Sequence, residues 1–288
     1  MFKSVIVIAF VGLLGCATGP APEPEVKIVP GPEVLVTANE NLNAALWTQT
    51  SAEWKALTLQ TYVQADMALD AMLKNKKWTA ATEQTENFAK KPAAIIVDVD
   101  ETVLDNSAYQ ARLVHENGSF TEDSWNAWCK EGKASAVPGS VEFLQKAASK
   151  GVTVFYVTNR AAEVEDVTRQ NLAAMGFPIA EGTDVVLTKG EKPEWTSDKT
   201  TRRQTVAETH RVVMMFGDNL GDFTTSGKGS IDERAAVVSE NAAKWGRGWY
   251  MLPNPMYGYW EAATFGYAYD LDPKAKQAAK AAKLVPLN

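Results

Sequence analysis

The chain has little cysteine or histidine and no excess of basic residues. Its 288 residues include only two cysteines and two histidines, too few for a disulfide framework or for a zinc site built mainly from those residues. The formal net charge of -6 at pH 7 disfavours sequence-independent binding to nucleic acid, which needs a basic surface to displace counterions. We therefore expect no nucleic acid polymer as a partner, and oxygen ligands for any bound metal.

The start of the chain also lacks an apolar run long enough to span a membrane. The run from Val5 to Leu14 follows Lys3 and falls short of the roughly 20 residues that cross a bilayer. It ends in Leu-Leu-Gly before Cys16, a pattern that resembles the lipobox of bacterial lipoproteins. The resemblance implies a signal peptide over residues 1–15 and a lipid anchor on Cys16. With Ala17 after the cysteine, it also implies the bacterial outer membrane, with the domain periplasmic or surface-exposed.

The next segments divide into a linker and a helical region. Residues 16–38 contain five prolines and no apolar periodicity, which favours an extended, Pro-rich spacer. Residues 39–91 carry apolar residues among polar ones without glycine or proline, which predicts two or three helices. We expect these helices to form a small α-helical subdomain together with a later insertion.

From residue 92 onward, short apolar runs alternate with helical stretches. Strands are expected over 93–99, 152–157, 185–187 and 212–216, and helices over 141–149, 163–175 and 201–209. Continuous apolar strands separated by helices indicate a parallel sheet covered on both faces. The sequence therefore predicts an α/β fold over residues 92–288, a Rossmann-like sheet of five strands flanked by helices. Ligands of such sheets bind beyond the carboxyl ends of the strands.

Acidic residues follow two of the expected strands. Asp98 and Asp100 lie at the end of the first strand, where alternating side chains point to the same side. Asp218 and Asp222 follow the strand over 212–216, among glycines that let the backbone turn tightly. An acidic turn would explain either pair alone, but not two pairs at one edge. Oxygen ligands of this kind suit Mg²⁺.

Hydrogen-bond donors follow the other expected strands. Thr158 and Asn159 end the strand that begins at Val152, and their hydroxyl and amide groups can bond phosphate oxygens. Two lysines lie near this part of the expected sheet. Lys189 follows the strand over 185–187, and Lys199 lies near the start of the helix over 201–209.

Together these segments resemble the four motifs of the haloacid dehalogenase superfamily. The matching positions are 98–104, Thr158, Lys199 and 217–223, in order and at suitable spacing. The sequence is more similar still to the superfamily's class C (subfamily IIIB) acid phosphatases, bacterial lipoprotein phosphatases that include lipoprotein 5′-nucleotidases. The likeness extends to the lipobox, the N-terminal helices and the segments 156–160 and 252–258.

The resemblance implies a role for each acidic residue. Asp98 would be the nucleophile that forms an aspartyl phosphate. Asp100 would protonate the leaving oxygen and then take a proton from the hydrolytic water. Asp98, the backbone carbonyl of Asp100, Asp218 and Asp222 would hold Mg²⁺.

The resemblance likewise implies three ligands for the phosphoryl oxygens, namely Thr158, Asn159 and Lys199. The family pattern has its lysine after a serine and before an arginine, which favours Lys199 over Lys189. Lys189 stays open as the alternative.

The segment from Asp105 to Pro138 has no strand pattern and resembles the small cap of this family. Such caps select the substrate. Trp125 lies in this segment, and Tyr257 lies in the loop expected after the last strand. Both resemble the family's nucleoside-binding aromatic residues, which implies that they stack on the leaving group.

The sequence thus predicts a Mg²⁺-dependent acid phosphatase that hydrolyses phosphomonoesters, with 5′-nucleotides and aryl phosphates as good substrates. Two alternatives stay open. One is the same fold transferring phosphoryl groups to an acceptor other than water. The other is a non-catalytic surface lipoprotein that binds a ligand, although the filled catalytic positions disfavour it. The family resemblance also implies a homodimer.

Overall fold

The computed structural model describes residues 39–286. The expected signal peptide, Cys16 and the Pro-rich linker lie outside the described residues. Among residues 39–286, no helix combines the length and the apolar character needed to cross a membrane.

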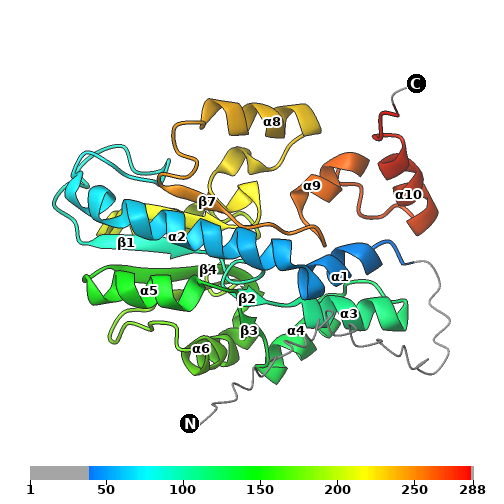
Figure 1. Cartoon of the computed structure of the whole chain (residues 1–288), viewed down its shortest axis with the longest axis horizontal. Helices are drawn as coiled ribbons and strands as arrows, with labels where there is room; N and C mark the ends of the chain where they lie inside the picture. Colours follow the sequence, from blue (N-terminus) through cyan, green and yellow to red (C-terminus); the bar gives the residue numbers. More distant parts are fainter. Residues whose placement is uncertain (1–38, 287–288) are drawn as a thin grey trace, which may run out of the picture. The chain divides into compact units, whose positions relative to one another are not determined.

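A five-stranded sheet lies at the centre of the described chain (Figure 1). In spatial order its strands are β5 (Val186–Lys189), β4 (Thr153–Ala161), β1 (Ala93–Val97), β6 (Arg211–Gly217) and β7 (Trp249–Met251). All neighbouring strands are parallel. Every residue of β6 is buried, which explains why its residues 212–216 are continuously apolar rather than alternating. The predicted α/β fold and five-stranded parallel sheet are confirmed.

The connecting helices cover both faces of the sheet. α5 (Ser140–Ser149) and α6 (Glu165–Ala174) connect strands in the direction from β1 toward β5. α7 (Thr200–Thr209) and α8 (Ile231–Glu240) connect strands in the opposite direction, toward β7. Because parallel crossovers are right-handed, the two pairs lie on opposite faces.

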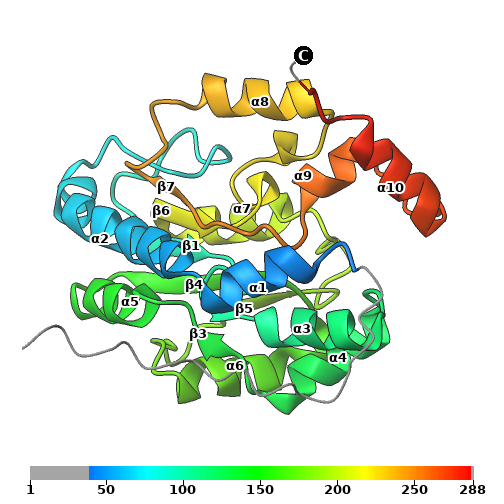
Figure 2. The same ribbon diagram turned by 45° about the vertical axis from the view of Figure 1, so that its right-hand side comes forward.

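The two N-terminal helices have different partners. α1 (Leu42–Thr50) packs against α3 (Ser107–Glu116) of the insertion, whereas α2 (Ala52–Lys74) packs against α5, β6 and β7. α2 and α5 lie side by side along the sheet (Figure 2). The buried residues of α2 recur every three or four positions, namely Trp54, Thr58, Tyr62, Ala65 and Leu69, and form the stripe that faces the sheet. The expectation that both helices join the insertion was therefore wrong for α2.

The insertion between β1 and α5 forms the cap. It contains α3 (Ser107–Glu116) and α4 (Glu122–Glu131), and α4 begins at a capping box formed by Thr121 and Ser124. A two-stranded antiparallel ribbon of β2 (Leu104–Asp105) and β3 (Ser135–Ala136) closes its base. The expectation of no strand here was wrong, because strands of two residues are too short to show alternation.

Short helical elements complete the chain. They are α9 (Tyr259–Ala262), α10 (Pro273–Ala281) and the 3₁₀ turns η1 (Ala162–Val164), η2 (Leu220–Asp222), η3 (Thr225–Gly227) and η4 (Ala263–Phe265). The turn η2 matters most for the site, because it directly follows β6.

A column of buried aromatic rings supports the chain after β1. Tyr62 of α2 stacks on Phe216 with ring centroids 5.4 Å apart, and Phe216 stacks on Tyr250 at 4.9 Å. The Tyr62 hydroxyl donates to the backbone oxygen of Thr102 at 2.7 Å. Each buried ring contributes roughly 1.5 to 3 kcal/mol to the stability of the fold. The hydrogen bond joins α2 to the segment after β1 that contains Asp98 and Asp100.

Candidate active site

The carboxyl ends of the parallel strands bring the predicted residues to one edge of the sheet. Asp98 follows β1, Asp218 follows β6, and Thr158 lies near the end of β4. Strand order reverses between β1 and β6, since the chain leaves β1 toward β4 and later returns to β6. Ligands of open α/β sheets bind at such a reversal.

Three carboxylates meet there. One oxygen each from Asp98, Asp218 and Asp222 lies within 4.8 Å of the others. A Cβ atom on Gly217 would lie 2.3 Å from an Asp222 oxygen, so the close approach requires glycine. The Asp222 carboxylate also accepts a hydrogen bond from the backbone N–H of Asn219 at 2.9 Å. The turn η2 therefore aims Asp222 at the end of β1.

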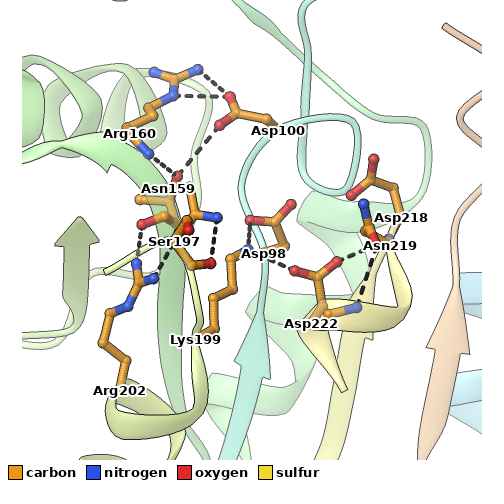
Figure 3. A network of polar contacts seen from close by, with 12 residues as sticks. Asp98, Asp100, Asn159, Arg160, Ser197, Lys199, Arg202, Asp218, Asn219 and Asp222 are labelled. Atoms are coloured by element: carbon orange, nitrogen blue, oxygen red, sulfur yellow. Dashed lines mark hydrogen bonds and ion pairs between the residues drawn. The ribbon is translucent and has the colours of Figure 1, made fainter. Parts of the chain in front are cut away.

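Lys199 is the lysine that reaches these carboxylates. It lies at the start of α7, and its buried ammonium donates to Asp98 and, at 2.7 Å, to Asp222 (Figure 3). Lys189 instead forms an ion pair of 3.0 Å with Glu122 of the cap helix α4. Of the two sequence candidates, only Lys199 lies beside the acidic cluster.

The carboxylates outnumber the lysine in this cluster. Burial raises the pKa of Asp98 to about 7 against the attraction of Lys199, and repulsion from Asp222 and Asp100 contributes to the rise. The pKa of Asp218 is also raised, first by loss of solvent and then by Asp222 and Asp98. Three carboxylates facing one ammonium leave an excess of negative charge. The cluster therefore fits a divalent cation with oxygen ligands.

Asp100 belongs to a different set of contacts. Its Oδ1 atom lies 2.9 Å from Nε and 2.8 Å from a terminal nitrogen of Arg160, which is fully buried. Asn106 donates to the same oxygen at 3.0 Å, and the Thr158 hydroxyl donates to Oδ2 at 3.3 Å. Asp100 thus has its own cation, separate from Lys199.

Asn159 lies at the exposed rim of the site. Its amide donates to the backbone oxygen of Ser197 at 3.0 Å and accepts from Arg202 at 2.6 Å. Arg202 also donates to the backbone oxygen of Thr158. These contacts join β4 to the segment that carries Lys199 (Figure 3).

The two predicted stacking residues lie in different surroundings. Trp125 is buried and meets Tyr109 edge to face at 5.1 Å. Tyr257 is half-buried and packs against a small cluster that includes Ala45 of α1 and Met256. The two rings form no stacked or edge-to-face pair with each other among residues 39–286.

An open pocket of about 400 Å³ lies beside the acidic cluster. Its lining consists of Trp47, Pro253, Asn254, Pro255 and Trp260. Asn254 connects the pocket to the cluster, because its amide donates to the Asp218 carboxylate at 2.7 Å. An apolar group in this pocket would therefore lie close to a predicted metal ligand.

Arg160, Asn254 and Glu101 are site residues to which the sequence analysis assigned no role. A signal for Arg160 was available, since a charged residue that continues an apolar strand must find a buried partner. Glu101 is buried at a positive φ of 57° and accepts from the backbone N–H of Asn106 at 2.9 Å. Burial, then Asp100 and Asp218, raise its pKa well above the ordinary value.

Comparisons with curated proteins link this chain to plant acid phosphatases. Acid phosphatase 1 of Solanum lycopersicum is 29% identical over 167 residues, which are 56% of this chain and 57% of that protein. A stem 31 kDa glycoprotein of Glycine max is 26% identical over 163 residues, 56% of this chain and 58% of that protein. The chain therefore spans less than two thirds of the length of these relatives.

Similarity to bacterial enzymes covers more of the chain. The structure of the class C acid phosphatase from Bacillus anthracis is 36% identical, with a TM-score of 0.75, over 86% of this chain and 98% of that one. The same enzyme with tungstate bound matches equally well. The family described as HAD superfamily, subfamily IIIB (Acid phosphatase), matches residues 32–260. On this agreement of sequence and fold, the chain belongs to the subfamily IIIB acid phosphatases of the HAD superfamily.

Proposed function

We propose that this protein is a Mg²⁺-dependent acid phosphatase that hydrolyses phosphomonoesters through a phosphorylated Asp98. The observation that carries the proposal is the contrast between two carboxylates at one strand end. Asp98 lies in an acidic cluster beside Lys199, whereas Asp100 is paired with Arg160. Different surroundings allow one carboxylate to act as nucleophile and the other as acid and base. The tungstate bound by the Bacillus anthracis relative, an oxyanion like phosphate, supports a phosphate site.

Positive and polar groups lie at the same edge of the sheet as Asp98. The Lys199 ammonium, the Thr158 hydroxyl and the Asn159 amide come from α7 and β4 at the same edge. They would bind the phosphoryl oxygens where negative charge accumulates. Mg²⁺ held by Asp98, Asp218 and Asp222 would screen the repulsion between the carboxylates and the phosphate.

The reaction has two displacements. In the first, an Asp98 oxygen attacks phosphorus, the bond to the leaving oxygen breaks, and Asp100 gives that oxygen its proton. In the second, water attacks the phosphorylated Asp98 and passes its proton to Asp100. The bond between the Asp98 oxygen and phosphorus breaks, inorganic phosphate is released, and Asp98 is again a carboxylate and Asp100 again protonated.

The decisive test replaces the nucleophile. Asp98→Asn should abolish turnover and prevent acid-stable labelling of the protein by ³²P from substrate, because the carboxylate nucleophile is replaced by a neutral amide. Asp184→Asn, which changes a carboxylate that pairs with Arg169, is the matched control and should keep full activity. Near wild-type kcat in Asp98→Asn would reject the mechanism.

A related measurement separates hydrolysis from phosphoryl transfer. Water as acceptor predicts inorganic phosphate as the phosphorus-containing product even when an alcohol is added. A new phosphate ester formed in proportion to the alcohol would favour the phosphotransferase alternative.

We expect 5′-nucleotides and aryl phosphates to be good substrates because aromatic side chains lie around the site. Trp125 and Tyr257 are the residues that the family resemblance favours. The pocket lined by Trp47 and Trp260 supports a second position for a planar leaving group, because Asn254 links it to Asp218. Stacking contributes roughly 1 to 3 kcal/mol per base and accepts any base.

The proposal of a lipid anchor in the outer membrane, with the domain periplasmic or surface-exposed, rests on the sequence alone. Lipidation of Cys16 would anchor the enzyme in the bacterial outer membrane through its linker. Cys16→Ser should leave an unprocessed or soluble species, measured by detergent partitioning and by the mass of the mature N-terminus. Unchanged partitioning and an unchanged mass would reject the anchor.

A further inference from the structure

The guanidinium of Arg160 contacts Asp100 in an unusual, one-sided way. Both Nε and a terminal nitrogen approach the same carboxylate oxygen, Oδ1, at 2.9 and 2.8 Å. Figure 3 shows the two contacts converging on that single oxygen rather than forming a fork across both. A bidentate pair would have engaged Oδ1 and Oδ2 equally. Here Arg160 binds Oδ1 of Asp100 and leaves Oδ2 without a contact to the guanidinium.

Other contacts hold the guanidinium in place. It donates to the Thr168 hydroxyl of α6 at 3.2 Å and to the Asn106 side-chain oxygen at 3.2 Å. That Asn106 oxygen also accepts from the Trp128 indole of the cap helix α4 at 2.8 Å. Arg160 is only 1% exposed. Because its partners come from α6 and the cap as well as from Asp100, it cannot follow a rotation of the Asp100 carboxylate.

The hydrogen bonds at the two Asp100 oxygens are unequal. Oδ1 receives the two Arg160 contacts and an N–H from Asn106 at 3.0 Å. Oδ2 receives only the Thr158 hydroxyl, at the longer distance of 3.3 Å. A proton on Oδ1 would face three N–H donors, which can offer it no acceptor. A proton on Oδ2 meets no such conflict.

We propose that Arg160 is the positioning residue that fixes Oδ1 of Asp100 and thereby reserves Oδ2 for proton transfer. This inference rests on the proposed function, in which Asp100 protonates the leaving oxygen. In that step the bond between phosphorus and the leaving oxygen breaks, and the proton moves from Oδ2 to the departing oxygen. In this assignment Arg160 acts through Asp100, because its side-chain polar contacts are with Asp100, Thr168 and Asn106.

The test compares two substrates whose need for the acid differs. Ethyl phosphate has a poor leaving group that must be protonated, whereas 2,4-dinitrophenyl phosphate releases a stable anion. The measured quantity is kcat/KM, which covers the steps through phosphorylation of Asp98 and excludes hydrolysis of the phosphorylated enzyme. Arg160→Gln should lose roughly 100-fold or more on ethyl phosphate, the cost of a misplaced catalytic group. It should lose less than about threefold on 2,4-dinitrophenyl phosphate, which needs little acid assistance.

A second variant keeps the test valid if Arg160→Gln does not fold. Arg160→Lys retains the charge but cannot present two N–H groups from fixed positions, so the same selective loss is expected. Arg202 provides the matched control, since it is equally buried and contacts Thr158 and Asn159 but not Asp100. Arg202→Lys should change both substrates by the same factor.

Asp100→Asn separates this inference from the proposed function. If Asp100→Asn is selective for ethyl phosphate but both Arg160 variants lose equally on the two substrates, the positioning role is overturned. Unchanged activity in Arg160→Lys on both substrates would also overturn it. If Asp100→Asn itself shows no selectivity, the acid role of Asp100 fails, and the assignment of Arg160 fails with it.

Discussion

Asp98 and Asp100 stand at one strand end, yet they belong to two halves of the site that differ in charge balance, one with an excess of carboxylates and the other with a matched pair. In the metal half, the three clustered carboxylates of Asp98, Asp218 and Asp222 have one ammonium beside them, that of Lys199, which pairs with Asp98 and Asp222. In the acid half, Asp100 has the guanidinium of Arg160 to itself. An uncompensated buried charge is costly, so the metal half needs an added cation and the acid half does not. Predictions for the two halves therefore differ.

The largest expected effect is loss of the cation from the metal half. Chelation with EDTA should lower kcat/KM by roughly 1,000-fold or more, and added Mg²⁺ should restore it, since excess charge would otherwise repel the phosphate. Asp218→Ala should behave like the chelated enzyme at ordinary Mg²⁺ concentrations.

The acid half supplies the control for this prediction. Asp100→Asn should keep the wild-type affinity for Mg²⁺, measured by calorimetric titration, because its side chain faces Arg160 rather than the cluster. Full activity after exhaustive chelation would contradict a need for Mg²⁺ in the metal half. Equal losses of Mg²⁺ affinity in Asp218→Ala and Asp100→Asn would show that the two halves do not differ in metal binding.

The second prediction concerns the lone cation of the metal half. Lys199→Met should lower kcat/KM by roughly 100-fold or more, because a donor to the transferring phosphoryl group is lost. It should also lower the free energy of unfolding by about 3 kcal/mol without Mg²⁺, as expected when a buried ion pair loses one partner. Added Mg²⁺ should recover part of this stability, which thermal unfolding would measure.

Lys189→Met tests the alternative lysine. Lys189 pairs with a largely exposed Glu122 on the cap, and such pairs contribute roughly 0 to 1 kcal/mol. Activity and stability should therefore stay close to wild type. A larger activity loss in Lys189→Met than in Lys199→Met would reverse the assignment.

The sequence predicted the fold well where the signal was long. The strands β1, β4, β5 and β6 each contain a continuous apolar run, and the parallel sheet follows from such runs separated by helices. The two-residue strands β2 and β3 gave no comparable signal. The surface that α2 covers was also missed, because an amphipathic helix indicates that it has a buried face but not which element covers it.

The sequence predicted which residues form the candidate site, but not which cation pairs with each carboxylate. Asp98, Asp218 and Thr158 stand next to strand ends, so their common edge follows from parallel topology. The split into two halves does not follow, because Arg160 and Lys199 reach their carboxylates through tertiary packing of β4 and α7. Two acidic residues in one short motif look equivalent until their partners are known.

A third and smaller effect is expected at Asn254, which orients a carboxylate of the metal half. Its amide donates to Asp218 at 2.7 Å, and loss of such a partner weakens metal binding by roughly 10- to 100-fold. Asn254→Ala should therefore raise the Mg²⁺ concentration for half-maximal activity while kcat at saturating Mg²⁺ changes little. Asn126→Ala, which removes a surface amide bound to Glu163, should shift neither value. A fall in kcat with unchanged Mg²⁺ dependence would contradict this role.

The smallest expected effect is the loss of stacking between an aromatic side chain and the leaving group. Two aromatic residues are candidates, one near each half of the site. Trp260 is 46% exposed and lines the pocket that Asn254 connects to Asp218, whereas Trp125 is 8% exposed and its ring lies 5.7 Å from the Arg160 guanidinium. Only an accessible ring can stack on a base without displacing its neighbours, so the exposed fractions favour Trp260.

We therefore expect Trp260→Ala to lower kcat/KM for a nucleoside monophosphate by roughly tenfold, the value of one stacked base, and to leave ethyl phosphate unchanged. Trp125→Ala removes a buried ring beside Arg160, so its main loss should fall on ethyl phosphate, with a lower melting temperature. The comparison needs both variants and both substrates. A selective loss on the nucleotide in Trp125→Ala, with Trp260→Ala unchanged, would instead assign stacking to the cap, as the family resemblance implies. Equal losses on both substrates in both variants would mean that these rings only support the fold.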